Sequence, residues 1–278
     1  MRRGEHGGDW AAYQIQYHGM PLDFSANVSP MGIPAGVKRA LYQAVEEVNR
    51  YPDPLCRQLR ACLGRHHDVP SAQILCGNGA SDLIDRLVLA LRPKRGMVTA
   101  PAFSEYAQAL RRVGCQVEEF SLQRAEDFRV TARILERITP ALDILFLSEP
   151  SNPAGQTTDR TLLEKILERC DACGVLLVVD ECFEEFLLDR SHSMVSNLMG
   201  HHLLILRAFT KFYGLAGVRL GTVCARRRRY WSRCVWRGSP GRCPTWPRQR
   251  GWRPWRRRCM ETSCGRGPGG GGRHFGWR

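Results

Sequence analysis

One lysine in this sequence stands in surroundings that could make its side chain reactive. Lys211 follows the apolar run Leu203–Leu206, which predicts a buried strand. The bulky side chains around it in the sequence are Phe209, Phe212, Tyr213 and Leu215. A lysine after a strand is commonly a solvated surface residue, but apolar neighbours disfavour its charged form and leave a nucleophilic amine. An amine of this kind forms a Schiff base with an aldehyde.

Two other segments place polar groups where a ligand could bind. The apolar run LLVVD ends at Asp180, and the carboxyl ends of parallel strands are where α/β sheets hold ligands. The segment ILCGNGASDLIDRL reads as a strand, a glycine-containing turn and a helix. Backbone N–H groups at such a helix start bind anions, which makes Gly79, Ala80 and Ser81 candidates. The alternative is an ordinary turn in which Ser81 caps the helix.

Two weaker motifs follow neighbouring strands. In APAFSEY, Phe103 and Tyr106 could face a ligand, although core packing is the commoner role of such aromatics. In SEPSNPAG, Asn152 lies in an Asn-Pro segment that is by itself a common turn signal.

Alternating strands and helices must position these residues, and this alternation predicts an α/β fold with a largely parallel sheet. The expected strands are Ile74–Cys76, Met97–Ala100, Gln116–Leu122, Ile144–Leu147, Leu176–Asp180, Leu203–Leu206 and Arg219–Ala225. The expected helices are Val37–Val48, a second one through Leu55, Leu59 and Leu63, then Ser81–Leu91, Ser104–Val113, Thr131–Ile138 and Asp159–Cys173. Residues 1–35, rich in Gly and Pro, are expected to be irregular.

In this order the motifs resemble the fold-type I family of pyridoxal-phosphate-dependent enzymes, the class I and II aminotransferases and their decarboxylase relatives. The resemblance implies a seven-stranded large domain, helices on both sheet faces, and pyridoxal 5'-phosphate as cofactor. It implies that Lys211 binds the cofactor and that Asp180 keeps its pyridine nitrogen protonated, which makes the ring an electron sink. The other implied contacts are Gly79, Ala80, Ser81, Thr210 and Arg219 at the phosphate, Phe103 on the ring and Asn152 at the phenolic oxygen.

Further motifs favour one branch of that family. HGGD, SANVSPMG, RYPDP and DECF resemble the members that decarboxylate L-threonine O-3-phosphate to aminopropanol phosphate in cobalamin biosynthesis. The alternative is a histidinol-phosphate type of aminotransferase. Phe183 favours the decarboxylase, because many aminotransferases have a tyrosine there that hydrogen-bonds the cofactor. The resemblance implies substrate contacts at His6, Gly7 and Asn27. It also implies a homodimer, in which Tyr51 reaches the neighbouring subunit's cofactor.

The end of the sequence has a different composition from the rest. Residues 226–278 hold 16 of the 41 basic side chains, one acidic residue and six of the seven Trp, so residues 1–225 carry 25 basic and 26 acidic side chains. A nucleic-acid-binding arm on an inactive scaffold is one interpretation. We favour a frameshift near Ala225, since Arg, Gly, Pro, Trp and Cys have G/C-rich codons.

These observations divide the chain into an N-terminal arm (1–35), a cofactor-binding large domain (36–225) and a disordered tail (226–278). In the family, a small C-terminal domain supplies an arginine that binds the substrate carboxylate. The tail lacks the pattern of that domain, so we expect little turnover.

Cysteine usage and hydropathy indicate the cellular compartment. Eight cysteines precede residue 226 in apolar segments, as free thiols of a reducing compartment would. No apolar run is long enough for a signal peptide core or a membrane span, and Cys170-x-x-Cys173 has no second ligand pair for zinc. We therefore expect a cytoplasmic protein with a small-molecule substrate, no metal and no membrane contact.

Overall fold

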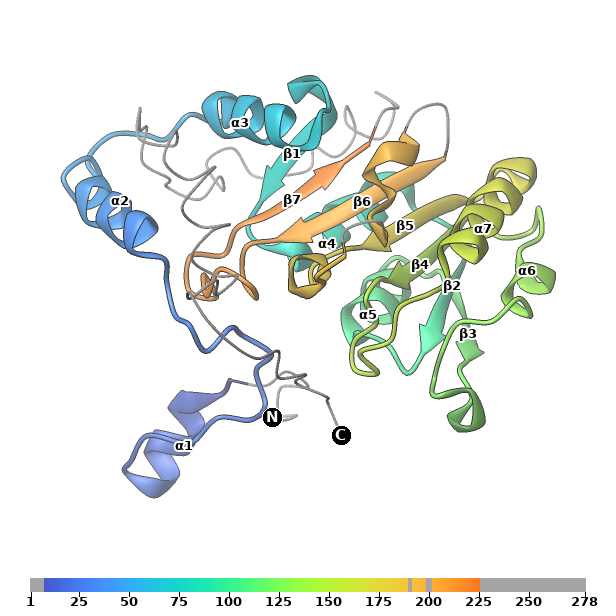
Figure 1. Cartoon of the computed structure of the whole chain (residues 1–278), viewed down its shortest axis with the longest axis horizontal. Coiled ribbons are helices and arrows are strands. Elements are labelled where there is room, and N and C mark those ends of the chain that lie inside the picture. Colours follow the sequence, from blue (N-terminus) through green and yellow to red (C-terminus); the bar gives the residue numbers. More distant parts are fainter. Residues whose placement is uncertain (1–7, 190–191, 199–201, 226–278) are drawn as a thin grey trace, which may run out of the picture.

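A seven-stranded sheet organises the fold in the computed structural model, which describes residues 8–189, 192–198 and 202–225. Its strands are β1 (Ile74–Gly77), β2 (Arg95–Ala100), β3 (Gln116–Ser121), β4 (Ile144–Ser148), β5 (Leu176–Asp180), β6 (Leu203–Ala208) and β7 (Gly221–Cys224). They lie in the order β1-β7-β6-β5-β4-β2-β3, and β7 alone runs antiparallel to its neighbours (Figure 1). The predicted mostly parallel sheet of seven strands is confirmed.

Before the sheet come α1 (Trp10–Tyr17), α2 (Ala35–Val45) and α3 (Arg57–His67). From β1 onward the helices alternate with the strands as predicted, and they are α4 (Ala80–Leu91), α5 (Ser104–Arg112), α6 (Ile134–Arg137) and α7 (Arg160–Cys173). Short 3-10 turns occur at Ser71–Gln73, Arg124–Glu126, Glu184–Phe186 and Met194–Leu198. The prediction at Thr131–Ile138 was too long, because only four residues there are α-helical.

Helix α7 shows how the sequence sets these elements. The Asp159 carboxylate caps its first turn by accepting a 3.0 Å hydrogen bond from the backbone N–H of Leu162. Leu163, Ile166, Leu167 and Cys170 recur at helical spacing and are buried. Gly174, with a φ of 72°, ends the helix in a left-handed conformation that glycine adopts without strain.

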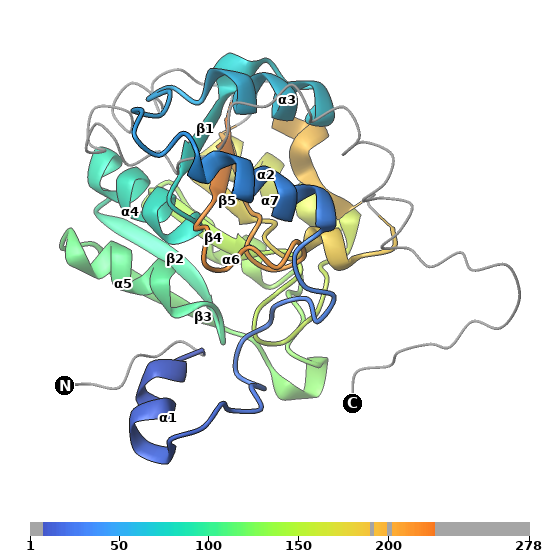
Figure 2. The same ribbon diagram turned by 90° about the vertical axis from the view of Figure 1, so that its left-hand side faces the viewer.

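Two hydrophobic cores lie on opposite faces of the sheet. Leu177 and Val179 of β5 belong to the core that also contains buried side chains of α3, α6 and α7. Leu176 and Val178 point the other way, into the core shared with α4 and α5 (Figure 2). Burial on both faces explains why the central strands are continuous apolar runs rather than alternating ones.

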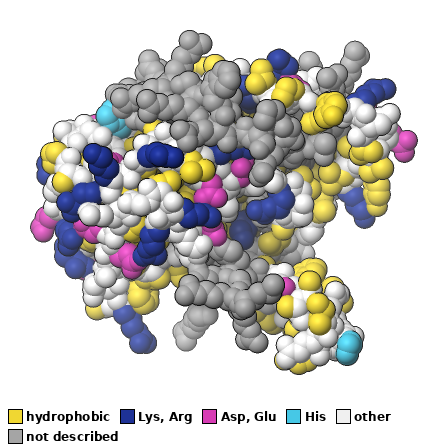
Figure 3. Space-filling view, turned by 180° about the vertical axis from the view of Figure 1, so that it is seen from behind, with side chains coloured by type: hydrophobic (Ala, Val, Ile, Leu, Met, Phe, Trp, Pro, Cys, Tyr) yellow, Lys and Arg dark blue, Asp and Glu magenta, His cyan; other side chains and the backbone are white. Residues whose placement is uncertain are grey.

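The N-terminal arm differs from its prediction. Residues 1–35 were expected to be irregular, but Trp10–Tyr17 form α1, whose first turn is capped by Asp9 through a 3.1 Å hydrogen bond from Ala12 N–H. No residue of α1 is buried, and the helix stands apart from the sheet (Figures 1 and 2). Its exposed apolar side chains form the isolated yellow lobe of Figure 3. Further along the arm, Ser29 N–H donates a 2.9 Å hydrogen bond to the Lys211 carbonyl.

Several predictions concern thiols, membranes and chain segments. Seven of the eight cysteines before residue 226 are free thiols, whereas Cys56 is disulfide-bonded, so the expectation of free thiols was wrong at that position. No helix in the described part of the chain is long and apolar enough to cross a membrane. The predicted tail at 226–278 and the substrate candidates His6 and Gly7 lie outside the described residues.

Candidate active site

The loop after β6 holds Lys211 in a partly buried position. All six residues of β6 are buried, and the strand brings Lys211 to the same sheet edge as the end of β5. The Lys211 Nζ atom lies 5.7 Å from the centroid of the Phe183 ring. Burial lowers the pKa of Lys211, and nearby Arg219 lowers it further, while Cys182 and Asp180 oppose the shift. This environment disfavours the charged form of the amine, as expected from the sequence.

Asp180 ends β5 as a buried carboxylate with two well-defined hydrogen bonds. Its side chain is 5 % exposed. The Tyr106 hydroxyl donates to Oδ2 at 2.6 Å, and the Cys182 backbone N–H donates to Oδ1 at 2.9 Å. Burial raises the pKa of Asp180, and hydrogen bonds from Cys182 and Tyr106 together with the charge of Lys211 counteract that rise. Asp180 can therefore face a protonated ring nitrogen from the carboxyl edge of the sheet.

The turn between β1 and α4 has the shape of an anion site. Gly79, with a φ of 84°, is the N-cap of α4, and no side chain caps the helix, so the alternative with Ser81 as the cap is not seen. A Cβ at Gly79 would lie 2.8 Å from the Arg219 Nη2 atom. The N–H groups of the first helical turn and the guanidinium of Arg219 thus meet at one point, a donor set that suits a phosphate.

Gly221 of β7 packs directly against the backbone of this turn. A Cβ there would lie 2.5 Å from the Gly79 carbonyl carbon and 2.7 Å from the Ala80 nitrogen. Only glycine therefore allows β7 to pass so close to the turn. The residues present fit the phosphate, ring nitrogen and aldehyde of pyridoxal phosphate.

The remaining predicted residues are only partly brought together. Asn27 Nδ2 donates a 3.5 Å hydrogen bond to Asn152 Oδ1, which joins the N-terminal arm to the loop after β4. Phe103 contacts Tyr106 edge-on, with ring centroids 5.5 Å apart. Thr210 is buried next to Lys211, whereas Tyr51 is 97 % exposed.

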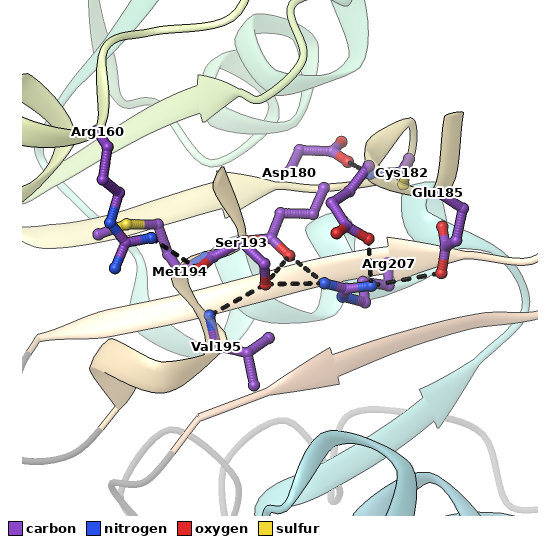
Figure 4. A network of polar contacts seen from close by, with 10 residues as sticks. Arg160, Asp180, Cys182, Glu185, Ser193, Met194, Val195 and Arg207 are labelled. Atoms are coloured by element: carbon purple, nitrogen blue, oxygen red, sulfur yellow. Dashed lines mark hydrogen bonds and ion pairs between the residues drawn. The ribbon is translucent and has the colours of Figure 1, made fainter. Parts of the chain in front are cut away.

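A buried ion cluster behind the site was not identified from the sequence. Arg207 of β6 donates to Glu181, to Glu184 at 3.0 Å and to Glu185 at 3.3 Å, and its guanidinium also contacts Ser193 at 3.0 Å (Figure 4). Glu181 adjoins Asp180, and Glu184 adjoins Phe183, so the cluster fixes the turn beneath Lys211. Two sequence features could have indicated this cluster. An arginine stands inside the apolar strand LLILRA, and the acidic segment DECFEE follows the strand before it in the chain.

Glu149 is a further buried acid near the site. Both of its carboxylate oxygens lie 3.0 Å from the Thr158 backbone N–H, and its own N–H donates to the Asp180 carbonyl at 2.9 Å. The loop between Glu149 and Thr158 carries Asn152. Burial raises the pKa of Glu149 to about 7, and the nearby charge of Glu181 adds to the rise, while the hydrogen bonds from Thr158 oppose it.

The sheet and the lysine loop have the architecture of the pyridoxal-phosphate-dependent enzymes of fold type I. The pattern of the class I and II aminotransferase family matches residues 20–237, and the chain belongs to this family. It is 42 % identical over 200 residues to the threonine-phosphate decarboxylase of Salmonella typhimurium, covering 72 % of this chain and 55 % of that protein.

Aminotransferases are also among the relatives. Histidinol-phosphate aminotransferase of Bacillus subtilis is 31 % identical over 204 residues, covering 72 % of this chain and 56 % of that protein. The crystal structure of histidinol-phosphate aminotransferase from Clostridium acetobutylicum superposes with a TM-score of 0.74 at 23 % identity, over 80 % of this chain and 65 % of that one. The chain spans about half the length of the curated relatives it matches.

Proposed function

We propose that this chain binds pyridoxal 5'-phosphate and belongs to an enzyme that decarboxylates L-threonine O-3-phosphate in cobalamin biosynthesis. The observation that carries the proposal is the convergence of Lys211, Asp180 and the Gly79 turn at one edge of the sheet. The 42 % identity to a threonine-phosphate decarboxylase supports the substrate. Phe183 supports the decarboxylase over the aminotransferase, because its ring offers no hydroxyl to the cofactor.

Each described site residue has a role in this proposal. The amine of Lys211 would hold the cofactor through its aldehyde. The N–H groups of Gly79, Ala80 and Ser81 bind the phosphate, together with Arg219 and the hydroxyl of Thr210. Phe103 packs on the ring. Asn152 accepts from Asn27 through its amide oxygen, which leaves the amide nitrogen to donate to the phenolic oxygen.

The chemistry divides between the cofactor and the protein. Pyridoxal phosphate, when bound, supplies an electron sink for the charge that develops on the substrate's α-carbon. Asp180, which accepts hydrogen bonds from Tyr106 and Cys182, would hold the proton on the ring nitrogen. With substrate bound, the Lys211 amine would be placed to carry a proton. His6, Gly7 and Asn27 contact the substrate.

We further propose a homodimer. Trp10, Tyr17 and Phe24 of the N-terminal arm are 48 %, 59 % and 88 % exposed, and Tyr51 is 97 % exposed. Large apolar surfaces of this kind mark protein interfaces. In the dimer Tyr51 reaches the cofactor of the neighbouring subunit. Light scattering of the purified chain is expected to give twice the monomer mass, and a monomer at micromolar concentration would refute the dimer.

The two candidate reactions are separated by ligand preference. We expect L-threonine O-3-phosphate to change the absorbance of the cofactor-loaded chain at lower concentrations than histidinol phosphate, with little turnover. Histidinol phosphate acting at the lower concentration, with glutamate formed from 2-oxoglutarate, would assign the aminotransferase reaction instead. Rapid release of carbon dioxide from threonine phosphate would show that residues 226–278 do not impair the enzyme.

A further inference from the structure

We propose that Tyr106 is a positioning residue that keeps Asp180 ionised and oriented toward the cofactor's ring nitrogen. This inference rests on the proposed function only for the identity of the cofactor. The hydrogen bond itself joins two residues 74 positions apart in the sequence, one on α5 and one at the end of β5.

The contact is held rigidly from several sides. Tyr106 is 1 % exposed, and its ring stacks on Phe146 of β4 with centroids 5.1 Å apart and an interplanar angle of 13°. Phe103 contacts the same ring edge-on. With its ring fixed between two aromatic side chains, Tyr106 can place its hydroxyl 2.6 Å from Asp180 Oδ2 without further loss of side-chain freedom.

The hydroxyl is needed because burial works against the charge of Asp180. Desolvation raises the pKa of this carboxyl, and the opposing groups come from three elements. They are Tyr106 from α5, the thiol and backbone N–H of Cys182 after β5, and the charge of Lys211 after β6. Tyr106 donates to Oδ2, so removing its hydroxyl takes a hydrogen bond away from that oxygen of a buried carboxylate.

The consequence concerns cofactor binding as well as the carboxyl itself. A neutral Asp180 cannot stabilise a protonated ring nitrogen, and an ionised one that has rotated cannot face it. Tyr106 does not contact the lysine loop in any hydrogen bond of the described residues. It therefore acts through Asp180 rather than on the cofactor directly.

The test compares Y106F, D180N and the double variant of the full chain. Y106F removes only the hydroxyl and leaves the stacked ring in place, and Y42F on the exposed face of α2 is the matched control. Without cofactor, Y106F should have a lower urea midpoint of unfolding than the wild type. We expect this difference to increase as the pH rises from 5 to 8.5. In the D180N background, the change in urea midpoint caused by Y106F should not depend on pH. A loss that is independent of pH, or equal in both backgrounds, would overturn the proposal.

The second measurement is the affinity for pyridoxal 5'-phosphate at pH 7.5, followed by absorbance. The free energy of a hydrogen bond to a charged group corresponds to a change of about tenfold in a dissociation constant. Y106F should therefore raise the dissociation constant for the cofactor by about that factor, and Y42F should leave it unchanged. In the D180N background, Y106F should add no further loss. Unchanged affinity in Y106F would overturn the proposal. A wild-type chain that binds no pyridoxal phosphate would instead contradict the proposed function, while the unfolding data still decide whether Tyr106 keeps Asp180 ionised.

Discussion

Replacing Glu149 by Gln is expected to stabilise the fold at alkaline pH. Glu149 is 2 % exposed, and in the described residues its carboxylate is matched by the hydroxyl and the backbone N–H of Thr158 rather than by a cation. A glutamine oxygen can accept the same hydrogen bond from Thr158. E149Q therefore removes a buried charge and keeps the contact that holds the Asn152 loop.

The magnitude follows from the pKa of the carboxyl, which rises from 4.5 to about 7 on folding. The folded protein binds this proton more tightly than the unfolded chain. The protonated Glu149 carboxyl therefore contributes its full stabilisation to the folded state below pH 4.5, and this contribution is lost as the pH rises through about 7. Each pKa unit corresponds to about 1.4 kcal/mol, so the wild-type chain should lose about 3 kcal/mol relative to E149Q across this range.

Urea denaturation of both chains between pH 5 and 8 measures this difference. We expect the free energy of unfolding of E149Q minus that of the wild type to increase with pH and level off above 7. E168Q, at an exposed position of α7, is the control and should give a difference near zero at every pH. A difference that stays constant with pH, or falls as pH rises, would refute the assignment of a buried ionising carboxyl at Glu149.

The other predictions concern the ion cluster and the phosphate turn. R207M leaves three buried acids without their cation, so we expect a loss of about 3–5 kcal/mol of unfolding free energy, larger at pH 8 than at pH 5.5; equal stability in urea melts would contradict this. G221A forces a Cβ against the backbone of Gly79 and should cost about 1–3 kcal/mol and weaken pyridoxal phosphate binding, whereas G217A has open space and should do neither. Equal effects of the two glycine variants would disprove the close approach.

Local sequence patterns were sufficient to predict the sheet and most of its helices. The short apolar runs Ile144–Leu147 and Leu176–Val179 are typical of strands buried on both faces, and the structure places them at the centre of the sheet. The failure at α1 has a physical cause as well. A helix with no buried residue has no apolar face turned to a core, so hydrophobic periodicity gives no signal for it.

Long-range contacts in the site were beyond sequence reasoning. Tyr106 reads as an ordinary core aromatic, because its hydroxyl meets Asp180 only after α5 and β5 have packed together. Arg207 looks anomalous within an apolar strand, but its acidic partners lie more than 20 residues away and become neighbours through the pairing of β5 with β6. The motif residues Lys211 and Asp180 could be found because Asp180 ends an apolar strand and Lys211 lies in the loop just after one.

Borohydride trapping with pyridoxal 5'-phosphate tests the central claim most directly. The sequence contains four lysines, and Lys38, Lys94 and Lys165 are exposed, whereas Lys211 is partly buried with a lowered pKa. After reduction and peptide mapping, we expect one cofactor per chain, attached to Lys211, and no stoichiometric labelling of K211A. Label spread over the exposed lysines, or equal labelling of wild type and K211A, would show that this fold does not hold the cofactor at the β6 loop.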